Sequence, residues 1–301
     1  MLSIAERGPA ISFRHWLASS GVLVPTELGV GGALTVSLLA VNRPVWSLLV
    51  AVWLLVYASY QIDSLGELKN FDTSTASSRS RYLQARKGRV VLQGVAAFLG
   101  AMLVTALHAG VWMSLSLLIF PASVVLYGMP VLRRMSLGLI PFDCVKSIPY
   151  AKSFYTAFFW GLLGVFSLVY VDPACAVGGA LLVFVLFAQR LFINTVFCDF
   201  KDIERDRAAG VVTPFVTLGR DRALRILAGL NLTTPLLLAM AVCIGALPAS
   251  ALFLSATVVY TQLYLNAARH AQINAELLCN VTADAEWLLW PLYLIVANAI
   301  L

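Results

Sequence analysis

The most evident shortage in this sequence is charge. Of its 301 residues, only 12% are Asp, Glu, Lys or Arg, whereas 60% are hydrophobic. A soluble domain carries about 25% charged residues, so this chain has roughly half of the charge that such a domain uses. The mean hydropathy of +0.86 agrees with that shortage. These values exclude a soluble globular protein and predict one that crosses a membrane several times.

Paired cysteines and nucleic-acid signatures are also lacking. The five cysteines, at positions 144, 175, 198, 243 and 279, show no paired spacing, so neither a disulfide framework nor a zinc site is expected. No RNP, zinc-finger or helix-turn-helix pattern occurs, and we expect no nucleic-acid partner. The first residues, MLSIAERGPAISFRHW, mix acidic and basic side chains before any apolar run and do not have the layout of a signal peptide.

Long apolar runs, by contrast, are abundant. Runs of about 17–25 apolar residues are long enough to cross the ~30 Å hydrocarbon core as helices. The sequence predicts an all-α, polytopic membrane protein, a bundle of nine transmembrane helices that forms a single domain over residues 1–301. The predicted spans are 21–42, 45–62, 90–109, 111–130, 150–170, 174–197, 223–245, 248–266 and 284–301.

The basic residues are sorted to one side of these spans. Arg43 is the only Lys or Arg in the loops after the first, third, fifth and seventh spans. The N-terminus and the other loops hold nearly all the rest. Cytoplasmic loops of membrane proteins carry the excess of Lys and Arg, so we expect a cell (inner) membrane protein with a cytoplasmic N-terminus. The C-terminus then lies on the far side, and the pI of 9.2 reflects this sidedness.

An acidic cluster follows directly on the sixth apolar run, in FCDFKDIERDR, residues 197–207. Asp199, Asp202 and Asp206 are spaced i, i+3, i+7, so on a helix they share one face about 60° wide, while Glu204 points elsewhere. Like charges on one helix face repel each other, by a few tenths of a kcal/mol per pair. This cost indicates that a cation binds there. A solvated helix end relieved by neighbouring basic residues is the alternative.

A second acidic face ends the second predicted span, in YASYQIDSLGELKNFD. Ser59, Asp63 and Glu67 are spaced i, i+4, i+8 and again share one face. The predicted topology puts both acidic faces at the cytoplasmic ends of their helices, where they can meet across the bundle. Ionisable residues at or within the membrane are candidates for function.

Oxygen ligands of this kind favour a hard cation, Mg²⁺ or Ca²⁺, over zinc. Mg²⁺ in particular keeps several waters and is usually held by one or two carboxylates together with substrate phosphates. Basic residues flank both acidic faces on the predicted cytoplasmic side. We therefore expect a metal-bridged diphosphate, and the bilayer setting favours one that carries an apolar tail. The flanking basic residues include Arg79, Arg81, Lys146, Lys152, Lys201 and Arg205.

Two polar residues lie inside the sixth apolar run. Arg190 and Asn194 are spaced i, i+4 on its last turns, and a buried Arg without a partner is costly in a membrane. We favour a role near the diphosphate over a structural bond between helices. Glu27, in the first predicted span, poses the same question with no neighbour in sequence to answer it.

At this point the residues resemble a known family. The sequence RLFINTVFCDFKDIERDRAAGVVTPFVTLGR is similar to the second aspartate-rich motif of the UbiA superfamily of intramembrane prenyltransferases. The similarity lies in the Asn before the motif, the D-x-x-D-x-x-x-D core, the Asp-Arg and Gly that follow, and the Thr-Pro…Leu-Gly ending. The stretch YGMPVLRR…VKSIPYAKSF resembles the segment after the fourth helix of that family. Nine helices with acidic motifs ending the second and sixth also match it.

This resemblance implies a central cavity that opens on the cytoplasmic side. It also implies Mg²⁺-dependent transfer of a prenyl group from a polyprenyl diphosphate to an aromatic or other lipophilic acceptor, through an allylic cation. The metal ligands and catalytic residues would be Asp63, Glu67, Asp199 and Asp202, with Asp206 as a further ligand. The residues that bind diphosphate would be Arg79, Arg81, Tyr127, Lys146, Lys152, Arg190, Asn194, Lys201 and Arg205.

Alternative functions remain open at this stage. The first motif of the family is N-x-x-x-D-x-x-x-D, but here Ser59 and Glu67 replace its first and last residues. This change keeps open a membrane terpene cyclase, a class of the same superfamily that ionises a prenyl diphosphate without an acceptor. A non-catalytic ion or lipid transporter is disfavoured because the acids crowd at one surface. The D-G-x-x-A-R signature of CDP-alcohol phosphotransferases does not occur.

Overall fold

The computed structural model describes residues 21–67, 83–128, 133, 141–208, 210–270 and 274–301. Within these ranges the chain is helical and has no β-strand, which confirms the all-α prediction. The first half of the chain contains η1 (Pro25–Val30), α2 (Gly31–Val41), α3 (Trp46–Glu67), α5 (Lys87–Ala109), α6 (Val111–Ser116), α7 (Ile119–Gly128), η3 (Val145–Ser147) and α9 (Ala151–Val171). The second half contains α10 (Val177–Cys198), η4 (Asp199–Asp202), α11 (Ile203–Ala208), α12 (Pro214–Leu218), α13 (Arg220–Asn231), α14 (Thr234–Cys243), η5 (Ala249–Ser255), α15 (Ala256–Ala267), α16 (Ala275–Leu277), η6 (Leu278–Ala283) and α17 (Glu286–Ile300).

Six helical stretches are long and apolar enough to cross a membrane: Trp46–Gly66, Lys87–Ala109, Val111–Gly128, Ala151–Val171, Val177–Ala208 and Arg220–Cys243. They correspond to six of the nine predicted spans. The other three predicted spans are shorter or less regular in the described part of the chain. The first is a π-helical turn followed by α2, the eighth begins as the 3₁₀ turns of η5, and the ninth is a 15-residue helix containing Pro291. The chain is therefore a multi-pass membrane protein, and the count of nine stays a prediction.

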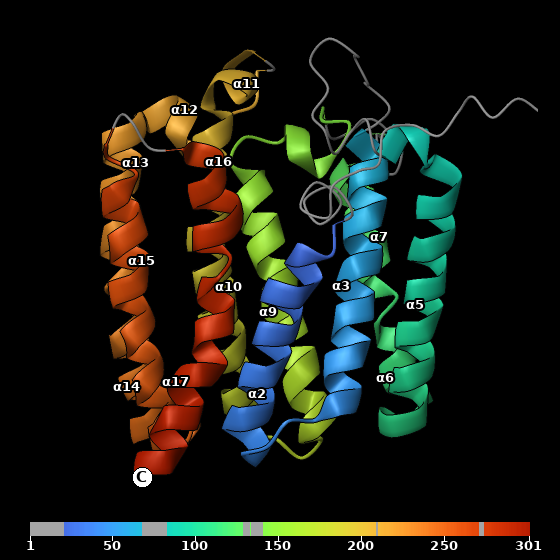
Figure 1. Cartoon of the computed structure of the whole chain (residues 1–301), viewed down its shortest axis with the longest axis vertical. Helices are drawn as coiled ribbons and strands as arrows, with labels where there is room; N and C mark the ends of the chain where they lie inside the picture. Colours follow the sequence, from blue (N-terminus) through green and yellow to red (C-terminus); the bar gives the residue numbers. More distant parts are fainter. Residues whose placement is uncertain (1–20, 68–82, 129–132, 134–140, 209, 271–273) are drawn as a thin grey trace, which may run out of the picture.

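The long helices run nearly side by side along one axis (Figure 1). The carboxyl end of α10, together with η4 and α11, lies at one end of the bundle, which we call the motif end. The carboxyl end of α3 lies at the same end, and the C-terminus of the chain lies at the opposite end (Figure 1). The prediction that the two acidic faces share one end of the bundle is therefore confirmed.

Helices α9 and α10 form the tightest pair that positions the site. Gly161 and Gly164 of α9 allow it, because a Cβ on either would lie within 3 Å of Phe184 or Phe187 of α10. Small residues permit this close approach between membrane helices. The pairing brings the first turn of α9 beside the last turn of α10, and both turns lie at the motif end.

Candidate functional site

The aspartates of the second motif lie where α10 changes its winding. α10 ends at Cys198, and Asp199 to Asp202 form the 3₁₀ turns of η4 before α11 resumes α-helical winding. A 3₁₀-helix has about three residues per turn, so Asp199 and Asp202 stay on one side. Asp199 and Asp206 are buried, and 17% of the Asp202 side chain is exposed. The glutamate at position 204 points outward, as predicted, with 84% of its side chain exposed.

Lys152 supplies the main counter-charge to these buried acids. From the first turn of α9, its Nζ donates a hydrogen bond to Oδ1 of Asp199 and lies 3.8 Å from Oδ2 of Asp206. Ser153 Oγ lies 3.5 Å from the second oxygen of Asp199. Buried carboxylates are tolerated only when a positive charge or donors compensate them. The fold therefore brings Lys152 next to Asp199 and Asp206, although the lysine lies 47 residues before Asp199 in the chain.

The loop before α9 is held in place by a backbone contact. The N–H of Tyr150, which adopts a positive φ of 62°, donates to the carbonyl of Val212 at 3.1 Å. This bond fastens the start of α9 to the segment that follows α11. Lys146, in η3, lies within electrostatic range of Asp206. Of the two lysines of VKSIPYAKSF, Lys152 therefore contacts the aspartate cluster and Lys146 lies near it.

The cluster keeps one carboxylate oxygen without a donor. Oδ2 of Asp206 is buried and has no hydrogen-bond partner within the described residues, and Lys152 stands 3.8 Å away from it. An unpaired buried carboxylate oxygen is unfavourable unless a cation compensates it. The acids therefore suit a hard cation in charge and ligand type. Among the described residues, however, no three His, Cys, Asp or Glu side chains lie close enough together to hold a metal ion without further ligands.

Asp63 of the first motif lies beside α7, the helix that packs on α9. Asp63 of α3 lies beside the carboxyl end of α7, where a Cβ on Gly128 would come 3.9 Å from its Oδ1. The neighbouring Tyr127 stacks on Tyr155 of α9, with ring centroids 5.7 Å apart. Tyr155 is one turn from Lys152 and donates a hydrogen bond of 2.8 Å to the carbonyl of Ser123. Asp63 thus lies beside α7, which packs on α9, the helix that carries Lys152.

Three residues of the predicted site cannot be placed. Arg79 and Arg81 lie outside the described residues. Glu67 is the last residue of α3, and its backbone is described but its side chain is not. Their predicted roles stay predictions.

Arg190 does not point into the aspartate cluster, and its predicted contact with diphosphate is wrong. The residue is 1% exposed, and its guanidinium forms an ion pair of 2.5 Å with Glu286 of α17. It also donates to Asn231 at 2.6 Å and to Thr234 at 3.2 Å. These partners, with Thr261, engage its donors inside the bundle. Arg190 is therefore the structural bond between helices that the sequence analysis held as the second option.

Asn194 also turns toward α17. Its Nδ2 donates to Oδ1 of Asp284 at 3.1 Å, and the described residues show no contact between Asn194 and the aspartates of the second motif. Glu27 of η1 lies nearby, within electrostatic range of Asp284, and its buried Oε2 has no hydrogen-bond partner in the described part of the chain. Sequence reasoning passed over Asp284 and Glu286. Two acids opening an otherwise apolar run, in ADAEWLLW, were the available signal.

The basic residues inside the second motif have separate contacts. Lys201 donates to the side-chain oxygen of Asn280 in η6, and Arg205 pairs with Asp202 at 3.0 Å while 71% exposed. Arg207 pairs with the exposed Glu204. Of the motif's own bases, only Arg205 therefore contacts one of the three aspartates directly.

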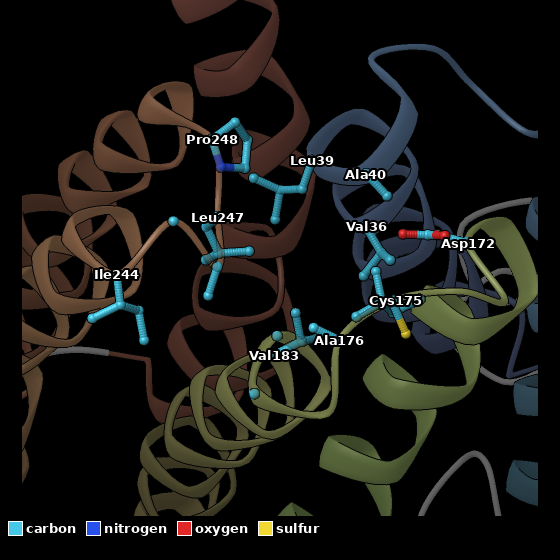
Figure 2. A pocket seen from close by; sticks show the side chains of 15 residues that line it. Val36, Leu39, Ala40, Asp172, Cys175, Ala176, Val183, Ile244, Leu247 and Pro248 are labelled. Atoms are coloured by element: carbon cyan, nitrogen blue, oxygen red, sulfur yellow. The ribbon is translucent and has the colours of Figure 1, made fainter.

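A pocket of about 520 Å³ lies at the other end of the bundle, between the α9–α10 and α14–η5 connections. Val36, Leu39, Val183 and Leu247 make its wall mainly apolar, and the Asp172 carboxylate lies at one side of it (Figure 2). Because the aspartate motif lies at the opposite end, this pocket is separate from the candidate site.

The fold and the site together describe a helical membrane protein that has an acidic cluster and a lysine at one end of its bundle. Two solved structures then specify the fold. A UbiA homologue from Aeropyrum pernix K1 is 17% identical, covers 94% of this chain and 98% of its own, and superposes with a TM-score of 0.60. A digeranylgeranylglyceryl phosphate synthase is 13% identical, with coverages of 96% and 99% and a TM-score of 0.59. The chain therefore has the UbiA-type membrane fold, and the resemblance predicted from the motifs is confirmed at the level of the fold.

The similarity to known proteins is found in the structure and not in the sequence. No protein-family model and no curated protein sequence matches this chain. The likeness is therefore carried by the arrangement of the helices.

Proposed function

We propose that this protein is an integral-membrane prenyltransferase that ionises a polyprenyl diphosphate at the motif end. The observation that carries the proposal is the contact of Lys152 with the buried Asp199 and Asp206, in a chain with the UbiA-type fold. A lysine between carboxylates at a membrane surface matches a substrate that brings both a metal ion and negatively charged phosphates. The inner-membrane location with a cytoplasmic N-terminus belongs to the same proposal.

The acids of the two motifs would hold Mg²⁺: Asp63, Glu67, Asp199, Asp202 and Asp206. Their oxygen ligands and the donor-free Oδ2 of Asp206 suit this ion, whose remaining positions water and substrate phosphates usually fill. When bound, such an ion stabilises the negative charge that develops on a leaving diphosphate.

The residues of the chain itself supply the positive charge for the diphosphate. Lys152 can exchange part of its contact with Asp199 for a phosphate oxygen, because it is 23% exposed and stands between two acids. Lys146 and Arg205 border the same acids. Preorganised cations aimed at a departing anion lower the barrier to its release. Arg79, Arg81 and Lys201 remain in the proposal as further contacts.

Aromatic rings follow the site along α9. Phe154 packs on Phe192 of α10, with centroids 4.5 Å apart, and Tyr155 packs on Phe159 at 4.8 Å. The faces of aromatic rings stabilise nearby cations. Phe154 is 63% exposed, so Tyr155 and Phe159, which lie deeper, are the rings that we propose for an allylic cation.

The test is an incubation of the purified protein with Mg²⁺ and a panel of prenyl diphosphates, with products identified by mass spectrometry. We expect diphosphate release that requires Mg²⁺ and a prenylated product that forms only with an added lipophilic acceptor. A cyclic hydrocarbon or terpene alcohol made without acceptor would favour the terpene cyclase. Absence of diphosphate release from every substrate would contradict both enzymes.

A further inference from the structure

A pocket of about 580 Å³ is formed mainly by arginines, and none of the motif aspartates lines it. It lies where α13 begins, at the motif end of the bundle (Figure 1). It is lined by Leu218, Gly219, Arg220, Asp221, Arg222, Arg225 and Arg269. The first six belong to the start of α13 and the residues before it, whereas Arg269 follows the end of α15. The pocket thus depends on two segments that the fold brings together.

Arg220 makes that junction. Its Nε donates to the carbonyl of Ala268 at 2.9 Å, and its Nη2 donates to the carbonyl of His270 at 3.1 Å. The guanidinium also lies 5.1 Å from the ring centroid of Phe200. These contacts hold the Arg220 side chain in place in the wall of the pocket. They bring Arg269 beside the start of α13, where two more arginines stand.

The three other arginines outnumber the acid that lies beside them. Arg222, Arg225 and Arg269 are exposed, and within the described residues none of them forms a hydrogen bond or an ion pair. Of the described residues that line the pocket, one, Asp221, is acidic. Converging like charges repel one another and raise the local concentration of ions of opposite sign. The pocket therefore selects for an anion.

The backbone adds donors on the same side. Gly219, the N-cap of the 12-residue α13, offers no side-chain cap, so the first N–H groups of the helix are not satisfied by a capping side chain. Free N–H groups at a helix start bind phosphate oxygens, and arginine binds them through two parallel hydrogen bonds. A phosphate group thus fits the pocket better than a carboxylate or chloride, since it offers several oxygens.

We propose that this pocket binds the headgroup phosphate of an anionic membrane phospholipid. The pocket opens where the candidate span Arg220–Cys243 begins, at the level of the membrane surface. Leu218 in the pocket wall and Ile226 on α13 are exposed apolar side chains, 37% and 51% accessible, that can contact acyl chains. A soluble phosphate would gain nothing from these apolar contacts. The proposal is independent of the prenyl-transfer reaction.

The experiment is native mass spectrometry of the full chain in neutral detergent. The protein is titrated with phosphatidylglycerol or with phosphatidylcholine of the same acyl chains. We expect preferential retention of phosphatidylglycerol, with about tenfold weaker binding in Arg225→Gln/Arg269→Gln, which removes one arginine from each segment. The matched control is Lys87→Gln/Arg89→Gln, which removes the same charge from exposed positions of α5 and should keep the preference. If the first variant does not fold, Arg222→Gln/Arg225→Gln takes its place, with folding checked by thermal melting.

Three results would overturn the proposal. The first is equal binding of the two lipids by the wild type, and the second is an equal loss of phosphatidylglycerol in the pocket variant and in the control. The third is displacement of the lipid by excess inorganic phosphate or diphosphate, which would assign the pocket to a soluble phosphate.

Discussion

Lys152 and Asp199 are 47 residues apart in the chain and form a hydrogen-bonded ion pair at the point where α9 and α10 meet. Asp199 is 2% exposed, so its negative charge is stabilised by this lysine more than by water. The same lysine stands 3.8 Å from Asp206. One cation thus compensates two acids, and adding a metal or removing the lysine should change the stability of the site.

Lys152→Met should destabilise the protein without metal and increase its response to Mg²⁺. The substitution leaves Asp199 and Asp206 buried without their counter-charge, which favours a bound cation. Thermal melts in detergent, with and without Mg²⁺, measure both effects. The control Lys87→Met removes an exposed lysine from α5 and should leave the Mg²⁺ response unchanged. An identical Mg²⁺ shift in wild type and Lys152→Met would place the metal elsewhere.

Asp63→Asn and Asp202→Asn should each abolish most turnover while the protein stays folded. Each change keeps the size of the side chain but removes one negative charge from the proposed metal site. Each change relieves repulsion between like charges, and the Arg205–Asp202 pair, with Arg205 71% exposed, is worth at most about 1 kcal/mol, so the melting temperature without metal should change little. Rates of diphosphate release and thermal melts check the two parts. Glu204→Gln is the matched control, since that side chain is 84% exposed and pairs with Arg207. Normal rates in both aspartate variants would refute their assigned roles.

Arg190→Met should reduce stability much more than it reduces the turnover of the folded protein. It leaves Glu286 buried without its partner, and breaking a buried ion pair costs about 3–5 kcal/mol. Arg190→Met/Glu286→Met should recover part of that loss because no charge then remains buried. Breaking the exposed Arg207–Glu204 pair should cost less than about 1 kcal/mol. A stable Arg190→Met protein that no longer binds diphosphate would restore the role predicted from sequence.

Metal and substrate should stabilise the protein as a linked pair. If both acidic motifs converge on one metal-bridged diphosphate, each ligand raises the affinity for the other. A ligand present at a hundredfold excess over its Kd stabilises the folded protein by about 2.7 kcal/mol. Melts with a prenyl thiodiphosphate alone or Mg²⁺ alone should therefore shift little, and both together should shift clearly. The synergy should vanish in Asp199→Asn/Asp202→Asn. Equal shifts with and without Mg²⁺ would mean that the apolar tail alone drives binding.

Labelling of introduced cysteines should place both acidic motifs on the cytoplasmic side. Reporters in the loops that follow the second, fourth, sixth and eighth predicted spans should react from the cytoplasm, because these loops carry the basic residues. Reporters near Pro173 and Pro248, at the opposite end of the bundle, should react from outside. Opposite reports from the loop with Arg79 and the loop with Arg205 would separate the two motifs and remove the shared site.

The sequence by itself determined the class of protein and the spacing of its acidic residues. Low charge and long apolar runs predict membrane helices because a span must be apolar along about 20 successive residues, which is a local property. The acidic spacings in DFKDIERD and in IDSLGE could be recognised for the same reason. The UbiA-type fold then followed from the resemblance of the motif around Asp199 and Asp202.

The tertiary structure decided which polar residues meet. From the sequence, Arg190 was expected to contact the substrate, but in the structure it pairs with Glu286, 96 residues away. Lys152 was one of several candidate basic residues, and the packing of α9 on α10 places it against Asp199. The winding also changes at Asp199, where η4 replaces the continuous helix that the spacing implied. Likewise, Arg269 lies beside the arginines of α13 because α13 and α15 pack together, with Arg220 donating to the carbonyl of Ala268. Which polar side chains pair depends on contacts between residues far apart in the sequence, and a local sequence pattern cannot predict such contacts.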